Sequence, residues 1–247
     1  MNRFFSAFLF AAAALPVARA EETPRPVIYQ LLVRTFGNTN ETRKVNGTLR
    51  VNGCGKFAHI TPAALSSLKE MGFTHIWLTG VLEQASGTAH PGIPADDPDI
   101  LKGVAGSPYA IRDYFDVSPD YAMVPAKRME EFKALLARCE AQGLRVLIDF
   151  VPNHVARSYS SDVRPDLSFG EGDQRGEFFH PDNSFFYLQE GETGLLLPTF
   201  GMSGCDGIFP PEKAQARVTG NNVVSARPAV GDWYETVKLN YGHDFTT

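Results

Sequence analysis

The sequence contains none of the short motifs that mark common nucleophile-, metal- or nucleotide-dependent enzymes. It has no G-x-S-x-G, H-E-x-x-H, G-x-x-x-x-G-K-[ST] or G-x-G-x-x-G pattern. The segment GMSGC at 201–205 departs from the serine elbow at its last position. These absences argue against a serine hydrolase, a zinc peptidase, a P-loop enzyme and a dinucleotide-binding fold.

Cysteine is scarce, with three residues at positions 54, 139 and 205. Their spacing matches no zinc-binding pattern. Cys139 falls on the apolar face of a predicted helix, which favours a buried free thiol. Cys54 and Cys205 lie in glycine-rich segments and could pair in an exported protein, so the sequence leaves their disulfide state open.

Long apolar runs are also lacking, apart from Phe4–Leu15 near the N-terminus. This run is too short for a membrane-spanning helix, which needs about 20 residues. Arg3 precedes it, and Ala18-Arg19-Ala20 follows with the small-residue pattern of a cleavage site. We therefore predict a signal peptide at residues 1–20 and a secreted or periplasmic protein, with no membrane attachment after cleavage.

The chain has no excess of positive charge. Its net charge is −5, and removal of residues 1–20 leaves 21 basic against 28 acidic side chains, a net charge of −7. This balance argues against nucleic acid or an anionic membrane surface as a partner. It is compatible with a neutral ligand such as a carbohydrate.

Three compact apolar runs, at 27–33, 73–79 and 144–151, predict strands. Helical patterns separate them, the first beginning at Thr61-Pro62 with an N-cap and a proline at the first position. The second begins at Pro125. The order β-α-β-α-β with apolar strands is typical of an α/β fold with a parallel sheet.

Two long segments interrupt this alternation. Residues 80–124 are expected to form a connection between the second strand and the second helix. Residues 155–235 are rich in Gly, Asp and Phe and predict an inserted, irregular subdomain. A loop of this length in a compact domain usually has a function.

The third predicted strand ends in the segment DFVPNH at 149–154. Polar residues just past the carboxyl ends of parallel strands face the ligand crevice. The segment resembles the D-x-V-x-N-H region of the α-amylase family of glycoside hydrolases. YAIRDY at 109–114 resembles the family's Y-x-I-x-D-Y segment. GKFAHI at 55–60 resembles G-x-[FL]-x-G-I, with His59 in place of the usual glycine.

The resemblance implies a partial TIM (β/α)8 barrel. Residues 21–154 would be its first part, with strands one to three. Residues 155–235 would be the inserted domain B, and residues 236–247 would return toward strand four.

The resemblance also implies hydrolysis of α-glucosidic linkages in starch, maltodextrin or related α-glucans by a retaining two-carboxylate mechanism. In the family the nucleophile, the acid/base and a third carboxylate follow strands four, five and seven. We therefore assign no catalytic residue here and expect the chain itself to be inactive. Alternatives are a transglycosylase or isomerase of the same family, or a non-catalytic carbohydrate-binding homologue.

The resemblance assigns substrate-holding and supporting roles to individual residues. Tyr109 would stack on or border the sugar ring whose bond is cut, and His154 would hydrogen-bond its primary hydroxyl. Asp149 would orient neighbouring side chains. Asn153 would be a ligand of a structural Ca²⁺, but TVKLNY at 236–241, which resembles the family's L-P-D-L-N segment, places Lys238 where the family has an aspartate.

Overall fold

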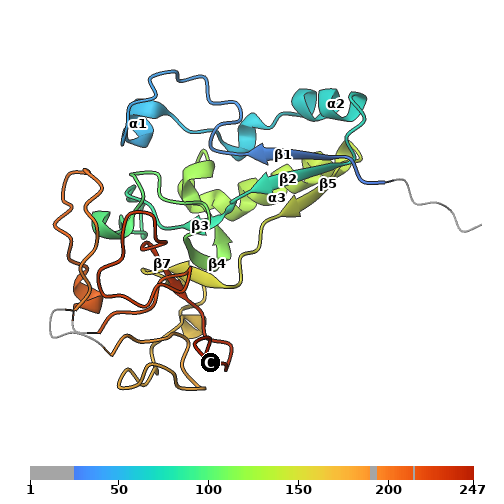
Figure 1. Ribbon diagram of the computed structural model, residues 1–247. Coiled ribbons are helices and arrows are strands. Elements are labelled where there is room, and N and C mark those ends of the chain that lie inside the picture. Colours follow the sequence, from blue (N-terminus) through green and yellow to red (C-terminus); the bar gives the residue numbers. More distant parts are fainter. Residues whose placement is uncertain (1–24, 190–193, 214) are drawn as a thin grey trace, which may run out of the picture.

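A three-stranded parallel sheet organises the N-terminal half of the molecule (Figure 1). The computed structural model describes residues 25–189, 194–213 and 215–247, so the predicted signal peptide lies outside the described residues. The strands are β1 (Ile28–Leu32), β2 (His75–Thr79) and β5 (Arg145–Ile148), in the order β1-β2-β5. Both pairs are parallel, as the sequence predicts.

Two helices follow the first two strands and pack on the sheet. They are α2 (Pro62–Glu70) and α3 (Arg128–Ala141). Thr61 caps α2 by accepting a hydrogen bond from Ala64 N at 3.2 Å. The apolar side chains of both helices join those of the strands in one core, so the predicted β-α-β-α-β order is confirmed; its most buried members include Leu31, Val33, Ile60, Leu65, Ile76, Leu78, Leu135 and Cys139.

The remaining helices are single turns within the connections. They are α1 (Leu49–Asn52), η1 (Phe57–His59), η2 (Pro98–Ile100), η3 (Pro119–Tyr121), η4 (Pro125–Lys127), η5 (Pro165–Leu167) and η6 (Pro210–Glu212). Every helix in the described part of the chain is too short or too polar to cross a membrane.

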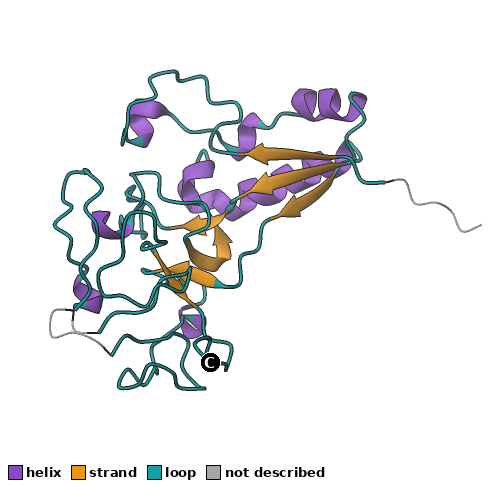
Figure 2. Cartoon of the chain, viewed as in Figure 1, coloured by secondary structure: helices purple, strands orange, loops and turns teal. Residues whose placement is uncertain are grey.

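The connection at 80–124 contains more structure than the sequence indicates. It forms an antiparallel pair of strands, β3 (Leu82–Gln84) and β4 (Ile111–Val117) (Figure 2). The short strand β3 carries two polar residues, Glu83 and Gln84, and both are buried. Its local pattern is therefore not that of an apolar strand, although the tertiary structure buries it.

The described residues of 155–235 contain few helices or strands, but they have their own apolar clusters. The segment is joined to the rest by β6 (His154–Ala156), which pairs antiparallel with β7 (Thr236–Lys238). His154 therefore begins a strand instead of lying in a loop. Aromatic rings fill the two clusters, among them Tyr159, Phe169, Phe185, Phe186, Tyr187, Phe209 and Tyr234.

The three cysteines are free in this structure. Cys54 and Cys139 are buried, and Cys205 is partly exposed. Burial raises the pKa of the Cys139 thiol to about 11, as expected for an inert core thiol. The pairing of Cys54 with Cys205 that the sequence left open is not formed.

Gly55, the first residue of the GKFAHI segment, lies too close to neighbouring backbone for any side chain. A Cβ there would come within 1.9 Å of Val33 O and 2.4 Å of Phe36 O. We expect Gly55→Ala to lower the free energy of unfolding by about 2–3 kcal/mol, measured by urea denaturation. Gly176→Ala is the control because a Cβ at Gly176 meets nothing within 4 Å. Equal stabilities of the two variants would contradict this reading of Gly55.

Candidate active site

A pocket of about 450 Å³ lies beyond the carboxyl ends of β2 and β5. This size is within the usual range for small-molecule sites. The pocket brings together three of the four site residues predicted from the sequence; the fourth, Asp149, is not part of the lining, although its charge helps to raise the pKa of Tyr109. Its lining consists of Lys102, Ser107, Tyr109, Val151, Asn153, His154, Trp233, Glu235 and Thr236.

Asp149 follows β5 and connects the ends of two strands. Its Oδ1 accepts a hydrogen bond from Trp77 Nε1, and its Oδ2 accepts one from Gly80 N at 3.0 Å. The pKa of Tyr109 is raised by burial first and by the charge of Asp149 second. The two hydrogen bonds of Asp149 tie the end of β5 to β2 and to the residue that follows it. The orienting role of Asp149 toward a ligand site stays a prediction.

Tyr109 lies in the turn before β4, and 39% of its surface is exposed. Its backbone N donates to Ser107 Oγ at 3.3 Å, and its side chain lines the pocket. The aromatic ring offers an apolar surface to a ligand.

His154 is 5% exposed and is held by its neighbours. Its Nδ1 is 2.8 Å from Asn153 Oδ1. Burial lowers the pKa of His154 and the charge of Lys238 lowers it further, whereas the backbone carbonyl of Tyr109 opposes this shift. The ring is therefore neutral at pH 7 and suited to hydrogen bonds with hydroxyl groups.

Six residues of the pocket lining were not predicted from the sequence, and three of them have large or charged side chains: Trp233, Lys102 and Glu235. Trp233 is 42% exposed, and its ring lies 5.2 Å from that of His154. Lys102 and Glu235 form an ion pair, with Nζ 3.2 Å from Oε2. Trp233 and Glu235 lie just before the segment that resembles L-P-D-L-N. This position in the sequence is the feature from which their place near the site could have been predicted.

The surroundings of Asn153 do not fit a calcium ion. The Asn153 side-chain oxygen contacts His154, and strand pairing places Lys238 opposite His154. Glu235 is the one carboxylate in the described lining of this pocket, and it is paired with Lys102. Calcium takes six to eight oxygen ligands, and these residues offer too few.

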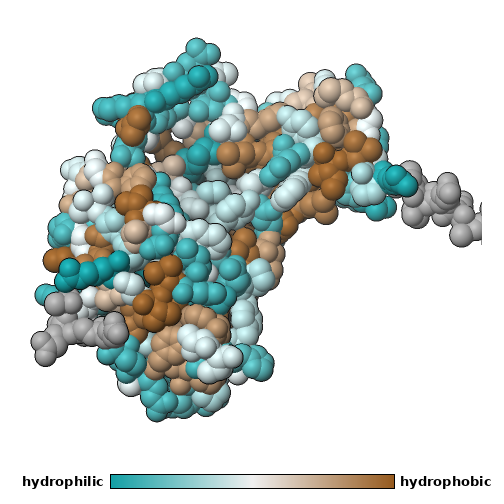
Figure 3. Space-filling model, viewed as in Figure 1, coloured by the Kyte–Doolittle hydropathy of each residue, from teal (hydrophilic) through white to brown (hydrophobic). Residues whose placement is uncertain are grey.

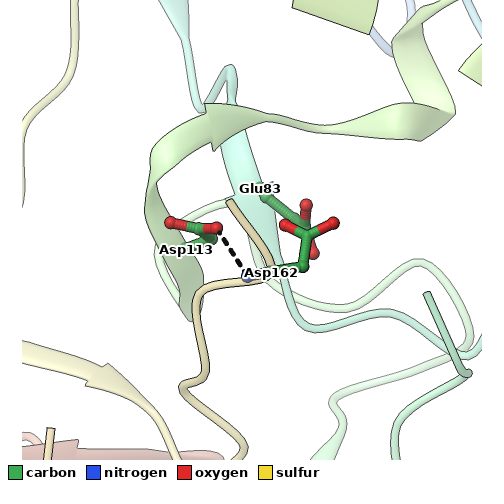
Figure 4. A group of neighbouring side chains, drawn as sticks. All are labelled: Glu83, Asp113 and Asp162. Atoms are coloured by element: carbon green, nitrogen blue, oxygen red, sulfur yellow. Dashed lines mark hydrogen bonds between the residues drawn. The ribbon is translucent and has the colours of Figure 1, made fainter. Parts of the chain in front are cut away.

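Elsewhere, the carboxylates of Glu83, Asp113 and Asp162 gather with oxygens within 4.8 Å of one another (Figure 4). Asp162 N donates to Asp113 Oδ2 at 3.2 Å. A guanidinium already supplies positive charge there, because Arg128 Nη2 lies 2.9 Å from Asp162 Oδ2 and 3.8 Å from Glu83 Oε2. The group is therefore an ion network between β3, β4 and α3.

The buried Glu83 makes this network sensitive to pH. Burial first, then the charge of Asp162, raise the pKa of Glu83 from 4.5 to about 8. The folded state then binds more protons than the unfolded state between these values, so its stability falls as pH rises toward 8. We expect the Tm of the wild type to fall between pH 5 and pH 9, by about 2–4 °C, and Glu83→Gln to remove most of this fall. Glu171→Gln, at an exposed position, should retain it.

The sequence matches the family described as "Alpha amylase, catalytic domain" over residues 30–185. Maltase 1 of Drosophila virilis is 27% identical over 221 residues, which cover 89% of this chain and 25% of the maltase. Cyclomaltodextrin glucanotransferase of Geobacillus stearothermophilus is 24% identical over 74% of this chain and 25% of its own length. The chain thus spans about a quarter of these curated relatives.

Among solved structures, an alpha-amylase from Lactobacillus plantarum is similar at 23% identity, with a TM-score of 0.45 over 88% of this chain and 32% of that one. The family match includes the last three residues of β1 and all of β2 and β5, together with Tyr109, Asp149 and His154. It covers more than half of the 247 residues. On this match, the chain belongs to the α-amylase family.

Proposed function

We propose that the protein hydrolyses α-glucosidic linkages, as in starch, maltodextrin or related α-glucans, and that this chain supplies the part of the site that holds the sugar. The observation that carries the proposal is the pocket in which Tyr109 and His154 meet at the ends of parallel strands. In retaining hydrolysis two carboxyl groups about 5–5.5 Å apart act on the bond. Residues that fix the sugar ring hold that bond in place for them.

The chemistry of the pocket supports a neutral, hydroxyl-rich ligand. Tyr109 offers an aromatic surface, and His154 offers a neutral imidazole ring that can hydrogen-bond hydroxyl groups. The net negative charge of the chain disfavours an anionic partner. A carbohydrate meets these conditions because its C–H faces are apolar and its hydroxyl groups both donate and accept.

Calorimetric titration of the 247-residue chain with two disaccharides tests the substrate class. We expect maltose, which is α-linked, to bind. Cellobiose has the same composition and a β-linkage, and it should bind at least about tenfold more weakly, a difference of about 1.4 kcal/mol. Equal affinities, or no binding of either sugar, would contradict the proposal.

The proposed fold of the whole protein is a (β/α)8 barrel. In this proposal β1, β2 and β5 are its first three strands, residues 155–235 are domain B, and residues 236–247 lead toward strand four. Exposed apolar side chains along the sheet support it (Figure 3). On β5, Leu147 is 39% exposed and Ile148 is 46% exposed, and further strands of a barrel would cover them.

Glucosyl transfer to a second sugar is the alternative reaction. The match to a cyclomaltodextrin glucanotransferase supports it, because transfer and hydrolysis differ in the acceptor and need the same sugar-holding residues. A non-catalytic carbohydrate-binding protein is the alternative from another class. Product analysis with maltose as both donor and acceptor separates the two reactions in a protein that carries the catalytic carboxylates.

We also propose that the protein is exported, because residues 1–20 have the pattern of a signal peptide. We expect the protein from its native host to begin at Glu21, as read by N-terminal sequencing. A cytoplasmic protein that retains Met1 would remove this part of the proposal.

We infer that Lys238, and not a calcium ion, supplies positive charge beside Asn153 and His154. Its charge acts on His154, whose pKa it helps to lower. We therefore expect EDTA to leave the Tm of the chain unchanged, because no bound metal contributes to stability. Addition of 5 mM Ca²⁺ after EDTA should have no effect either. A Tm that falls with EDTA and recovers specifically with Ca²⁺ would show that the protein binds calcium and would contradict this inference.

A further inference from the structure

One wall of the pocket has no role in holding the sugar at Tyr109 and His154. It is formed by Trp233, Lys102 and Glu235. Trp233 is 42% exposed, although its backbone is fixed: its carbonyl accepts hydrogen bonds from Thr236 N at 3.0 Å and Thr236 Oγ1 at 2.9 Å. A large aromatic side chain on a fixed backbone, partly open to a pocket, is a surface suited to stacking.

Glu235 supplies a buried acceptor at the same wall. It is 5% exposed, and its Oε2 accepts no hydrogen bond from any residue that the structure describes. Lys102 Nζ lies 3.2 Å away, so its charge compensates the carboxylate without the geometry of a hydrogen bond. Glu235 is part of the pocket lining, so its carboxylate can accept a hydrogen bond from a ligand hydroxyl there.

Lys102 is itself held in position. Its ammonium lies 5.3 Å from the centre of the Tyr234 ring. Tyr234 is fully buried, and its hydroxyl donates to Leu101 O at 2.8 Å. Lys102 therefore packs against a buried, hydrogen-bonded ring. The Lys102 side chain remains 27% exposed. A donor and an acceptor lie side by side, as recognition of neighbouring sugar hydroxyls requires.

We propose that Trp233 and the Lys102–Glu235 pair bind a second sugar ring, next to the ring held by Tyr109 and His154. This inference rests on the proposed function and extends it: the site recognises a disaccharide unit. Trp233 stacks on the apolar face of the second ring. Lys102 donates to one hydroxyl, and Glu235 accepts from its neighbour. The contact between the Trp233 and His154 rings, 5.2 Å apart, places the two ring sites side by side.

Titration with glucose and maltose separates the two ring sites. We expect the wild-type chain to bind maltose more tightly than glucose. Trp233→Ala should lower maltose affinity about tenfold and change glucose affinity less than about twofold. Glu235→Gln keeps the shape and removes the charge, and it should lower maltose affinity about fivefold. Phe115→Ala is the matched control, since Phe115 is also 42% exposed and lies outside the pocket lining.

Tryptophan fluorescence gives a second readout. The chain has two tryptophans, and Trp77 is held by Asp149 behind the pocket. Maltose should therefore change the emission of the wild type, and Trp233→Phe should remove most of that change. If Glu235→Gln does not fold, the Trp233 variants decide the question alone.

The outcomes distinguish the inference from the function on which it rests. If the wild type binds neither sugar, both are overturned. If it binds both sugars and Trp233→Ala leaves the ratio of the two affinities unchanged, the second ring site is overturned and the proposed function stands. A parallel loss of glucose and maltose affinity in Trp233→Ala would assign Trp233 to the support of His154 and would also overturn the second ring site.

Discussion

The 247-residue chain on its own is expected to release no measurable reducing sugar from soluble starch or maltose. Retaining hydrolysis needs a nucleophile and a proton donor about 5–5.5 Å apart, on either side of the bond. Among the described residues, Glu235 is the one carboxylate that lines the pocket, and Lys102 pairs with it. Asp149 does not line the pocket, and it accepts hydrogen bonds from Trp77 Nε1 and Gly80 N.

The expected loss is large because enzymes of this kind accelerate their reactions by at least about 10⁶-fold. The measurement is a reducing-sugar assay at high chain concentration, with binding of maltose to the same sample as the control for an intact pocket. A starch-degrading amylase under identical conditions serves as the positive control. Sugar release in proportion to the concentration of this chain would contradict the assignment of the pocket as a holding site alone.

Removal of the Tyr109 and His154 side chains, which we propose hold the sugar, should have the second-largest effect. In a protein that carries the catalytic carboxylates, Tyr109→Ala and His154→Ala should each raise the barrier for kcat/KM on a maltooligosaccharide by about 2–4 kcal/mol. The same variants of the 247-residue chain should bind maltose and glucose more weakly. Both sugars are affected because these residues hold the ring that every ligand of the site shares.

Matched controls separate this effect from a loss of folding. Phe200→Ala removes an aromatic side chain that is 39% exposed, as Tyr109 is, but that lies outside the pocket lining. His243→Ala removes an exposed histidine. Both should retain wild-type affinity. Wild-type activity and binding in Tyr109→Ala and His154→Ala would show that the YAIRDY and DFVPNH segments do not form the site.

The parts of the fold that could be predicted from the sequence are those with a strong local pattern. The runs at 27–33, 73–79 and 144–151 are continuous and apolar because helices cover their sheet, and β1, β2 and β5 form there. Of the strands that were not predicted, β3, β6 and β7 have three residues each, and β4 has seven residues in which apolar and charged side chains are mixed. Glu83 in β3 is buried because Arg112 and Arg128 approach it from β4 and α3.

The same distinction applies to the site. Tyr109, Asp149, Asn153 and His154 stand in recognisable segments, and the structure brings them to one place. The side of the pocket formed by Lys102, Trp233 and Glu235 lies outside any recognisable sequence motif. Lys102 comes from the connection after β2, and Glu235 comes from the end of the irregular segment, so their meeting is a product of tertiary structure.

The hydrogen bond from Tyr234 to Leu101 also has a kinetic consequence. It joins residues 133 positions apart, and closing so long a segment costs chain entropy that later contacts must offset. Formation of the pocket therefore requires the irregular segment to be ordered on the sheet, and non-local contacts of this kind form slowly. During refolding, helical circular dichroism should recover before the ability to bind sugar, so a bound sugar would report the final stage of folding and not the collapse of the sheet.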